Sequence, residues 1–377
     1  PTYATGDNTL KYVRETRRVN GADVETVLLD SVASQANRME EALLEAWERK
    51  EVSFPVIGVD FTGDEALRDL GKVTSLQAPH RIADAILRDA MSADGTLFRD
   101  TDAGRAYTDA TPRNATAVFR YCPTALVFGV WDSTGPKGGL GAKFARVLTS
   151  EIVGVGFQSG AKVGSRLDPL GIQANVEIYH HKDDDSEWTL DEGEAKKDKG
   201  KPVPFNRKGG EGKGKPSAVN HSNIAPSKDE WAGGVTFDYA EQVVVLSLAG
   251  IRKLRFTAGY DGATLSADAA RAAHGALAAL GLAAVAYARA WGHDLRSRCL
   301  LVPEGELVLQ AVLASGATED YALSTSAASA LLRMAAEAAG VAGLGWEREP
   351  IALAPAPKLV ALVKKSRAEA AAGAVED

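Results

Sequence analysis

Residues 119–154 read FRYCPTALVFGVWDSTGPKGGLGAKFARVLTSEIVG and join a short apolar run to a glycine-rich loop and a second apolar stretch. Leu126 to Trp131 is rich in β-branched and aromatic residues, which predicts a buried strand. Four glycines then fall between Gly135 and Gly141. Beyond the loop, apolar residues recur at helical spacing, so we expect a helix there: Leu140, Phe144, Val147, Leu148 and Ile152.

A glycine-rich loop that opens a helix is suited to an anion, because the helix start presents unpaired N–H groups and a partial positive charge. Lys137 and Lys143 add formal charge to this loop. Neither the Walker nor the dinucleotide pattern fits, because Leu140 and Phe144 stand where those patterns require glycine. The spacing therefore leaves two alternatives open, a phosphate site or a tight turn that serves helix–strand packing.

Composition bounds the class of protein. The chain has 377 residues, 45% of them hydrophobic, enough for one large or two modest domains. Its net charge of −7 counts against coating nucleic acid by bulk charge, so a nucleic-acid site must be a local basic surface. Cys122 and Cys299 fit two buried thiols in a cytosolic protein, without a disulfide or zinc framework. The apolar stretch 276–288 is too short to span a bilayer, and the N-terminus shows no signal pattern, so we expect a cytoplasmic protein.

The flanking sequence alternates strands and helices. Val24 to Leu29 predicts a first strand, and Ser34 is the expected N-cap of the helix that follows. Gln35, Asn37 and Arg38 crowd the first turn, either to hold an anion or as ordinary capping on a solvated face. We expect further strands at 53–61, 114–121, 155–159, 171–180, 243–248, 299–302 and 306–312, and helices at 78–91, 266–290, 325–339 and 357–372.

A charged insertion interrupts this alternation. Residues 183–194 hold seven acids and no base, whereas residues 196–215 hold eight bases against two acids. Apolar residues are scarce, so the segment is not expected to bury a core of its own. The pair His180–His181 beside Asp183 is a weak metal-binding pattern without a second ligand cluster, and we expect no metal and no cofactor.

The order of elements predicts an α+β fold with a ferredoxin-like, RNA-recognition-motif-like sheet, a common platform for RNA. We call this sheet with its helices the palm and assign it residues 1–180 and 232–312. Residues 181–231 form the charged insertion, called the thumb. Residues 313–377 are expected to form a helical, alanine-rich extension that packs on the palm.

Two stretches carry a family resemblance, Ser34 to Arg38 and Cys122 to Lys143, with weaker support from Arg166 to Gly171 and Gly233 to Thr236. They resemble the backbone subunit of type I-U, or I-G, CRISPR surveillance complexes, the Cas-seven family of the RAMP superfamily. The resemblance implies a Cascade-like ribonucleoprotein in antiviral defence. Copies would stack head to tail along the guide RNA as a helical filament and present it to target DNA.

The resemblance also implies which residues act. A subunit that binds guides of any sequence must hold phosphate and sugar. The expected RNA-binding residues are Ser34, Gln35, Asn37, Arg38, Arg113, Arg120, Ser133, Thr134, Lys137, Gly138, Gly139, Lys143 and Arg166. The expected contacts of the thumb with a neighbouring copy are Lys208, Lys213, Lys215, His221 and Asn223.

The expected partners are the guide RNA, target DNA paired to it, further copies of the chain and other subunits of the complex, with no membrane. No nucleophile–histidine–acid set or carboxylate pair is evident, so we expect no catalysis. The alternative is a phosphate- or nucleotide-handling enzyme that uses the loop at 135–143.

Overall fold

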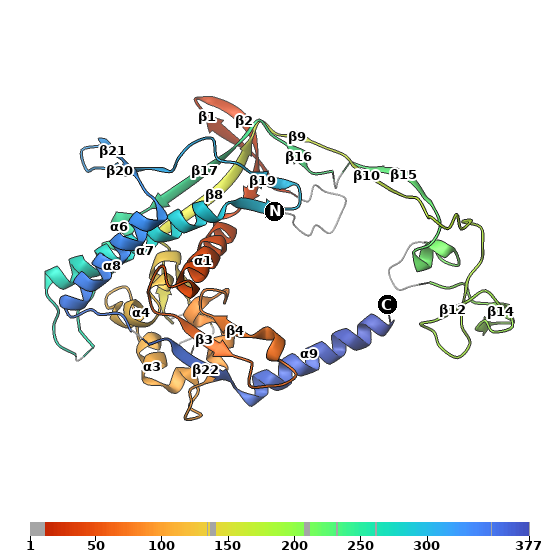
Figure 1. Cartoon of the computed structure of the whole chain (residues 1–377), viewed down its shortest axis with the longest axis horizontal. Helices are drawn as coiled ribbons and strands as arrows, with labels where there is room; N and C mark the ends of the chain where they lie inside the picture. The colour runs from red at the N-terminus through yellow and green to blue at the C-terminus, as the bar shows by residue number, and fades with distance from the viewer. Residues whose placement is uncertain are drawn as a thin grey trace. The chain divides into compact units, whose positions relative to one another are not determined.

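The computed structural model describes residues 12–133, 135, 141–206, 212–230, 233–260, 262–347 and 349–376. The chain divides into two compact units. Figure 1 shows the helices and strands of the whole chain, coloured from the N-terminus to the C-terminus. The first unit contains Thr26–Val155 and Tyr239–Ala361. The second contains Gly156–Asp238 with the segments before Thr26 and after Ala361. Helices and several small sheets occur together, which confirms the predicted α+β class.

The larger antiparallel sheet has the strand order β1-β2-β8-β17. Its strands are β1 (Arg14–Val19), β2 (Ala22–Asp30), β8 (Leu148–Val155) and β17 (Tyr239–Leu246). Strand β8 pairs antiparallel with both β2 and β17. Helices α1 (Val32–Glu48) and α7 (Ala267–Trp291) pack on β8 and β17, respectively, and on each other.

A second sheet, in the first unit, has the order β4-β3-β22-β5. It consists of β3 (Ile57–Asp60), β4 (Lys72–Thr74), β5 (Ala90–Met91) and β22 (Ile351–Pro355). Strand β22 runs parallel to β3 and antiparallel to β5. The C-terminal part of the chain therefore supplies an internal strand, in addition to the expected helices α8 (Thr325–Val341) and α9 (Pro357–Glu376).

The predicted strands at 114–121 and 126–131 are wrong. These residues form two short helices, α4 (Thr116–Tyr121) and α5 (Thr124–Phe128), and only β6 (Val130–Trp131) is extended. Every residue of α5 is buried, and a helix buried on all sides gives the same continuous apolar run as a buried strand. Other short helices are α2 (Ala85–Arg88), α3 (Asp102–Thr108) and α6 (Leu248–Ile251).

The helix expected after the glycine-rich loop is also absent. The chain leaves the loop as β7 (Lys143–Phe144), which pairs with β6, and then enters β8. The first four residues of β8 alternate between buried and partly buried positions, as in a strand, and Leu148 and Ile152 are both buried. Strands β6 and β7 therefore pair antiparallel on either side of the loop, and the described residues 141–155 contain no helix.

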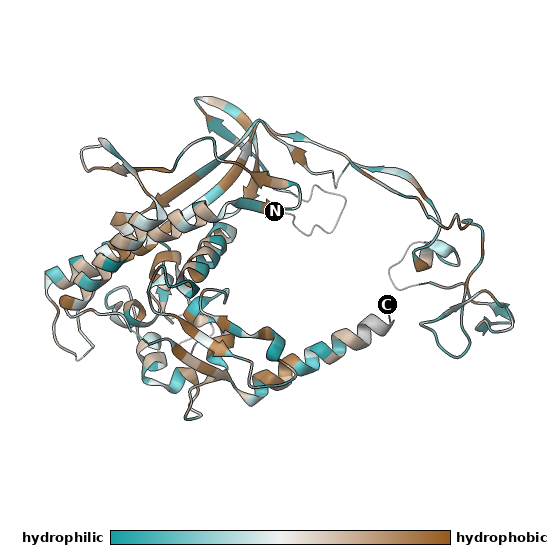
Figure 2. Cartoon of the chain, viewed as in Figure 1, coloured by the Kyte–Doolittle hydropathy of each residue, from teal (hydrophilic) through white to brown (hydrophobic). Residues whose placement is uncertain are grey.

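Helix α7 begins after Ser266, whose side chain accepts a hydrogen bond from the Ala269 N–H, as predicted. Among the described helices, α7 is long and apolar enough to cross a membrane by length and composition alone, but most of its apolar window is buried in the protein. Helix α8 lies along α7, and both are alanine-rich, which permits close approach (Figures 1 and 2).

The second unit contains a long antiparallel ribbon. Strand β10 (Lys162–Arg166) pairs with β15 (Ile224–Asp229), and β9 (Gln158–Ser159) pairs with β16 (Val235–Thr236). Between the two strands of the ribbon the chain forms two short strand pairs and a 3-10 helix. Strand β11 (Tyr179–His180) pairs with β12 (Trp188–Thr189), β13 (Lys197–Asp198) pairs with β14 (Lys201–Pro202), and the 3-10 helix is Pro216–Val219.

The expectation that this charged segment has no core is wrong. Ile178, Phe205 and Ala218 form a small buried cluster, with Val219 packed against it. The surrounding strands are mostly hydrophilic (Figure 2). The expected thumb, residues 181–231, lies within the longest continuous piece of the second unit, Gly156–Asp238.

The first unit also contains two hairpins, of which β18–β19 is partly buried and β20–β21 is mostly exposed. Strand β18 (His293–Arg296) pairs with β19 (Cys299–Leu301), and β20 (Val308–Val312) pairs with β21 (Thr318–Ala322). Cys122 is buried as expected, whereas Cys299 is only partly buried, and both are free thiols.

Candidate functional site

The start of α1 carries the first group of predicted site residues. Ser31, not Ser34, is the N-cap: its hydroxyl accepts a hydrogen bond from the Ser34 N–H at 3.3 Å. The helix begins directly after β2, so the cap falls three residues earlier than predicted. Ser34 is partly buried in the first turn, and Asn37 is exposed.

Gln35 is buried, with only 3% of its surface exposed. Its Nε2 donates to Asp30 Oδ2 at 2.6 Å, and its Oε1 accepts from Ser150 Oγ at 2.8 Å and Gln242 Nε2 at 2.9 Å. The side chain thus links α1 to β2, β8 and β17. The expectation that Gln35 is a surface residue on a solvated helix start is wrong, because each of its polar atoms has a partner inside the protein.

Arg38 links α1 to the C-terminal part of the chain. Its Nε donates to Asp30 Oδ2 at 3.0 Å, and its two terminal nitrogens donate to the main-chain oxygens of Asp294 (3.1 Å) and Leu295 (2.6 Å). Arg296 reinforces this link through a hydrogen bond to the main-chain oxygen of Leu29. Arg38 is therefore a structural tie as well as a partly exposed cation.

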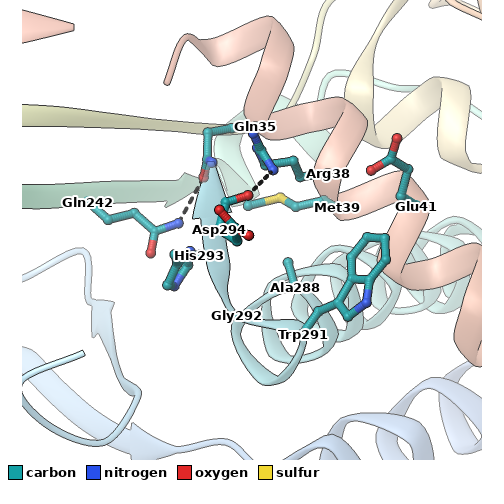
Figure 3. A pocket seen from close by; sticks show the side chains of 10 residues that line it. All are labelled: Gln35, Arg38, Met39, Glu41, Gln242, Ala288, Trp291, Gly292, His293 and Asp294. Atoms are coloured by element: carbon teal, nitrogen blue, oxygen red, sulfur yellow. Dashed lines mark hydrogen bonds between the residues drawn. The ribbon is translucent and has the colours of Figure 1, made fainter. Parts of the chain in front are cut away.

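A pocket of about 190 Å³ opens beside this tie (Figure 3). Residues from both ends of the chain line it, including Gln35, Arg38, Gln242, Trp291, His293 and Asp294. Sequence reasoning missed the last four. The signal for the last three is a tryptophan, glycine, histidine and aspartate in succession at the end of an alanine-rich helix, whereas Gln242 carries no short-range signal.

The second group of predicted site residues lies in the glycine-rich loop and at its two ends, which we call the loop base. Its two ends are closed by the β6–β7 pairs and by a hydrogen bond of 2.9 Å from the Asp132 N–H to the Ala142 oxygen. Trp131 is 52% exposed here, and the Lys143 ammonium lies 4.8 Å from the centre of its ring. An exposed indole with an adjacent cation is a surface that favours bases and phosphates.

A buried ion pair anchors this loop base. Both carboxylate oxygens of Asp132 accept hydrogen bonds from Arg99, at 2.7 and 3.0 Å, and Asp132 is only 1% exposed. Ser133 is exposed beyond it. The other predicted loop residues, Thr134, Lys137, Gly138 and Gly139, lie outside the described residues.

The two remaining predicted arginines of the first unit differ. Arg113 is exposed. Arg120 instead pairs with Glu347 at 2.9 Å and lies over the Tyr260 ring, 4.3 Å from its centre. Its guanidinium therefore has partners within the fold.

In the second unit the structure unites residues that sequence reasoning had assigned to separate roles. Arg166 donates to the main-chain oxygens of His221 (2.6 Å) and Ser222 (3.0 Å), while the Asp168 N–H donates to Asn223 Oδ1 at 2.7 Å. Hydrogen bonds from the N–H groups of Leu170 and Ser222 lower the pKa of Asp168. These contacts hold the turn after β10 against the segment before β15. Lys213 and Lys215 are exposed, and Lys208 lies outside the described residues.

Glu194 joins the His181–Asp183 pair in space, and the potential ligand atoms of these three residues lie within 4.8 Å of one another. Lys182 already pairs with the Glu194 carboxylate at 2.9 Å, and Asp183 is largely exposed. We propose no metal there, because competing cations and solvent satisfy these groups.

Residues 1–159 match the model of a family of CRISPR-associated proteins. That family is described as CRISPR-associated protein GSU0053, and the match confirms the resemblance to a CRISPR-associated family drawn from residues 34–38 and 122–143. No curated protein matches the chain. The match supports a Cascade-like subunit with a role in CRISPR defence.

Proposed function

We propose that the chain is the guide-RNA-binding backbone subunit of a type I-U surveillance complex, present in several copies and without catalytic activity. The observation that carries the proposal is the family match, which covers both the start of α1 and the entire glycine-rich loop. The match reaches 159 of 377 residues, so the roles of the later segments rest on the geometry described above.

The loop base supports binding that does not depend on sequence. Trp131 offers an exposed ring on which a base of any identity can stack, and Lys143 offers a charge for phosphate. The bidentate Arg99–Asp132 pair fixes the chain immediately after Trp131, so the platform is held in place before RNA arrives. Asn37 adds an exposed amide at the start of α1.

The larger sheet with α1 and α7 is our candidate for the RNA-recognition-motif-like palm. Segment 156–238 is our candidate for the thumb, which would contact a neighbouring copy. Its ribbon and its small core make it a preformed element, suited to head-to-tail contacts in a filament along the guide. Target DNA, other subunits and a cytoplasmic location follow from the same proposal.

The nucleotide-handling alternative is weakened. It relied on a helix N-terminus behind the loop, but Lys143 begins β7. In the described residues that follow the loop, 141–155, the chain is extended or irregular, so the helix N-terminus on which that alternative relied is not found there.

The test is to purify the full chain and measure its ultraviolet absorbance ratio and its size before and after ribonuclease treatment. Co-purified small RNA and a ladder of nuclease-sensitive oligomers support the proposal. A nucleic-acid-free monomer that binds nucleotides contradicts it and supports the enzyme alternative.

A further inference from the structure

We propose that the pocket between α1, the end of α7 and β18 binds a single nucleobase, with the sugar and phosphate outside. If the base belongs to a bound RNA strand, this proposal rests on the RNA-binding function proposed above. The pocket would then give the C-terminal part of the chain a direct role in holding RNA.

The pocket joins a stacking surface to a buried polar group. Trp291 ends α7 and is 52% exposed. Gly292 then turns the chain, with φ of 95°, and β18 begins at His293. Because a φ of this sign favours glycine, the turn lets Trp291 and His293 line one pocket although a single residue separates them (Figure 3).

His293 supplies the observation that points to a ligand. It is only 9% exposed, and its Nε2 is buried without a hydrogen-bond partner. A buried polar atom of this kind is rare in folded proteins, since its lost hydration is not replaced. Burial, with the nearby Arg289 and Arg38, lowers the pKa of His293, so the ring is neutral near pH 7. The Nε2 has no surface open to the pocket in this conformation, so pairing with the N–H or carbonyl edge of a base requires the imidazole ring to turn toward the pocket.

The charges of the lining disfavour a phosphate inside. Arg38 is the cation of the pocket, and its guanidinium already donates to Asp30, Asp294 and Leu295. The lining also includes the carboxylates of Glu41 and Asp294. A planar, uncharged ring with N–H donors therefore fits better than an anion.

The volume of the pocket also favours a single base as its ligand. A dry cavity of about 150 Å³ in another protein accommodates benzene. The present pocket of about 190 Å³ is therefore suited to one base and not to an entire nucleotide.

The test is photocrosslinking of the full chain with two probes, a single-stranded RNA of about 16 nucleotides containing 4-thiouridine, and free 4-thiouridine monophosphate. Trypsin releases residues 290–296 as one peptide, because Arg289 and Arg296 bound it. The variant is Trp291→Ala. The matched control is Tyr321→Ala, which removes an exposed aromatic side chain of β21, 52% accessible, that does not line the pocket.

We expect the RNA to label peptide 290–296, and Trp291→Ala to lose this label and to lower RNA affinity about tenfold, while Tyr321→Ala stays within about twofold. Labelling by the free nucleotide alone supports the pocket but contradicts the proposed source of the base. If RNA binds normally, neither probe labels the peptide and both variants behave alike, the pocket proposal is overturned and the RNA-binding function stands. If neither probe binds, both are overturned.

Discussion

Arg38 of α1 donates a hydrogen bond of 2.6 Å to the main-chain oxygen of Leu295 on β18. The same guanidinium holds the main-chain oxygen of Asp294 and the buried carboxylate of Asp30. The helix that follows the first strands of the chain is thus fixed by a strand more than 250 residues later. Changes at this helix start will act on stability and on binding together, and variants must separate the two.

Gln35 and Asn37 provide that separation, because they stand two residues apart on α1 with opposite exposure. Gln35→Ala should lower the free energy of unfolding by about 1–3 kcal/mol, since it leaves buried partners such as Asp30 and Ser150 without their hydrogen bonds. Asn37→Ala should change it by less than about 0.5 kcal/mol while weakening RNA binding. Urea denaturation and filter binding measure the two effects. Equal stability of the two variants would contradict the network around Gln35.

Lys143→Ala should weaken RNA binding by a similar factor for unrelated sequences. The slope of log affinity against log salt should fall by about 0.7, the value for one lost phosphate contact on a single strand. Lys365→Ala is the matched control, because this exposed lysine of α9 lies 3.7 Å from Glu369 on its own helix. A slope that is unchanged in Lys143→Ala would remove this lysine from the interface.

The thumb candidate can be excised at a defined point. Arg166 and Ile224 are paired in the ribbon, so an Asn-Gly turn in place of residues 167–223 should close a hairpin between them. Cutting at 183–215 instead would remove Phe205 and uncover Ile178 and Ala218. We expect the first unit to keep its thermal midpoint, short RNA to bind nearly as before, and cooperative assembly on long RNA to be lost.

Two outcomes would contradict this role. Loss of short-RNA binding to the same extent as assembly would make segment 156–238 a general RNA grip. Unchanged assembly would mean that neighbouring copies meet elsewhere on the chain.

His293 predicts a pH dependence of stability. Burial lowers its pKa in the folded state below the usual 6.5, so the folded protein favours the neutral ring. The neutral His293 ring contributes fully to the free energy of unfolding above pH 6.5. This contribution is lost as the pH falls below 6.5, because the unfolded chain then binds a proton at His293 more readily than the folded protein does. Arg289 and Arg38 act in the same direction, and Asp30 opposes them. When the pH is lowered from 7.5 to 5.5, the thermal midpoint of His293→Gln should fall by less than that of the wild type. Parallel losses would exclude His293 as the cause.

Local patterns were sufficient where one face of an element is buried. The strand at 24–29 appears in β2, and the cap at Ser266 and the C-terminal helices lie where their periodicity predicts. Periodicity failed for α5, where burial on every side removes the contrast between faces. It failed again at β8, where apolar residues on both faces of a central strand imitate helical spacing.

The residues of the candidate site also divide into those that local patterns predict and those that the tertiary fold determines. Exposed Asn37 and Lys143 stand at the surface, as their residue types suggest. The buried state of Gln35 depends on Ser150 and Gln242, which lie far away in sequence and on different strands. Trp291 and His293 lie near the start of α1 only because of the tertiary contacts that β18 makes with this helix. Pairing between distant segments leaves no short-range pattern, so these residues were not predictable from spacing.

The central claim is that several copies bind one RNA without regard to its sequence. Native mass spectrometry of the full chain on RNAs of increasing length, in two unrelated sequences, tests it most directly. We expect the complex to grow in steps of one 39.7-kDa chain as the RNA lengthens, with the same steps for both sequences. One chain per RNA at every length, or a number of chains that follows the sequence, would contradict the claim.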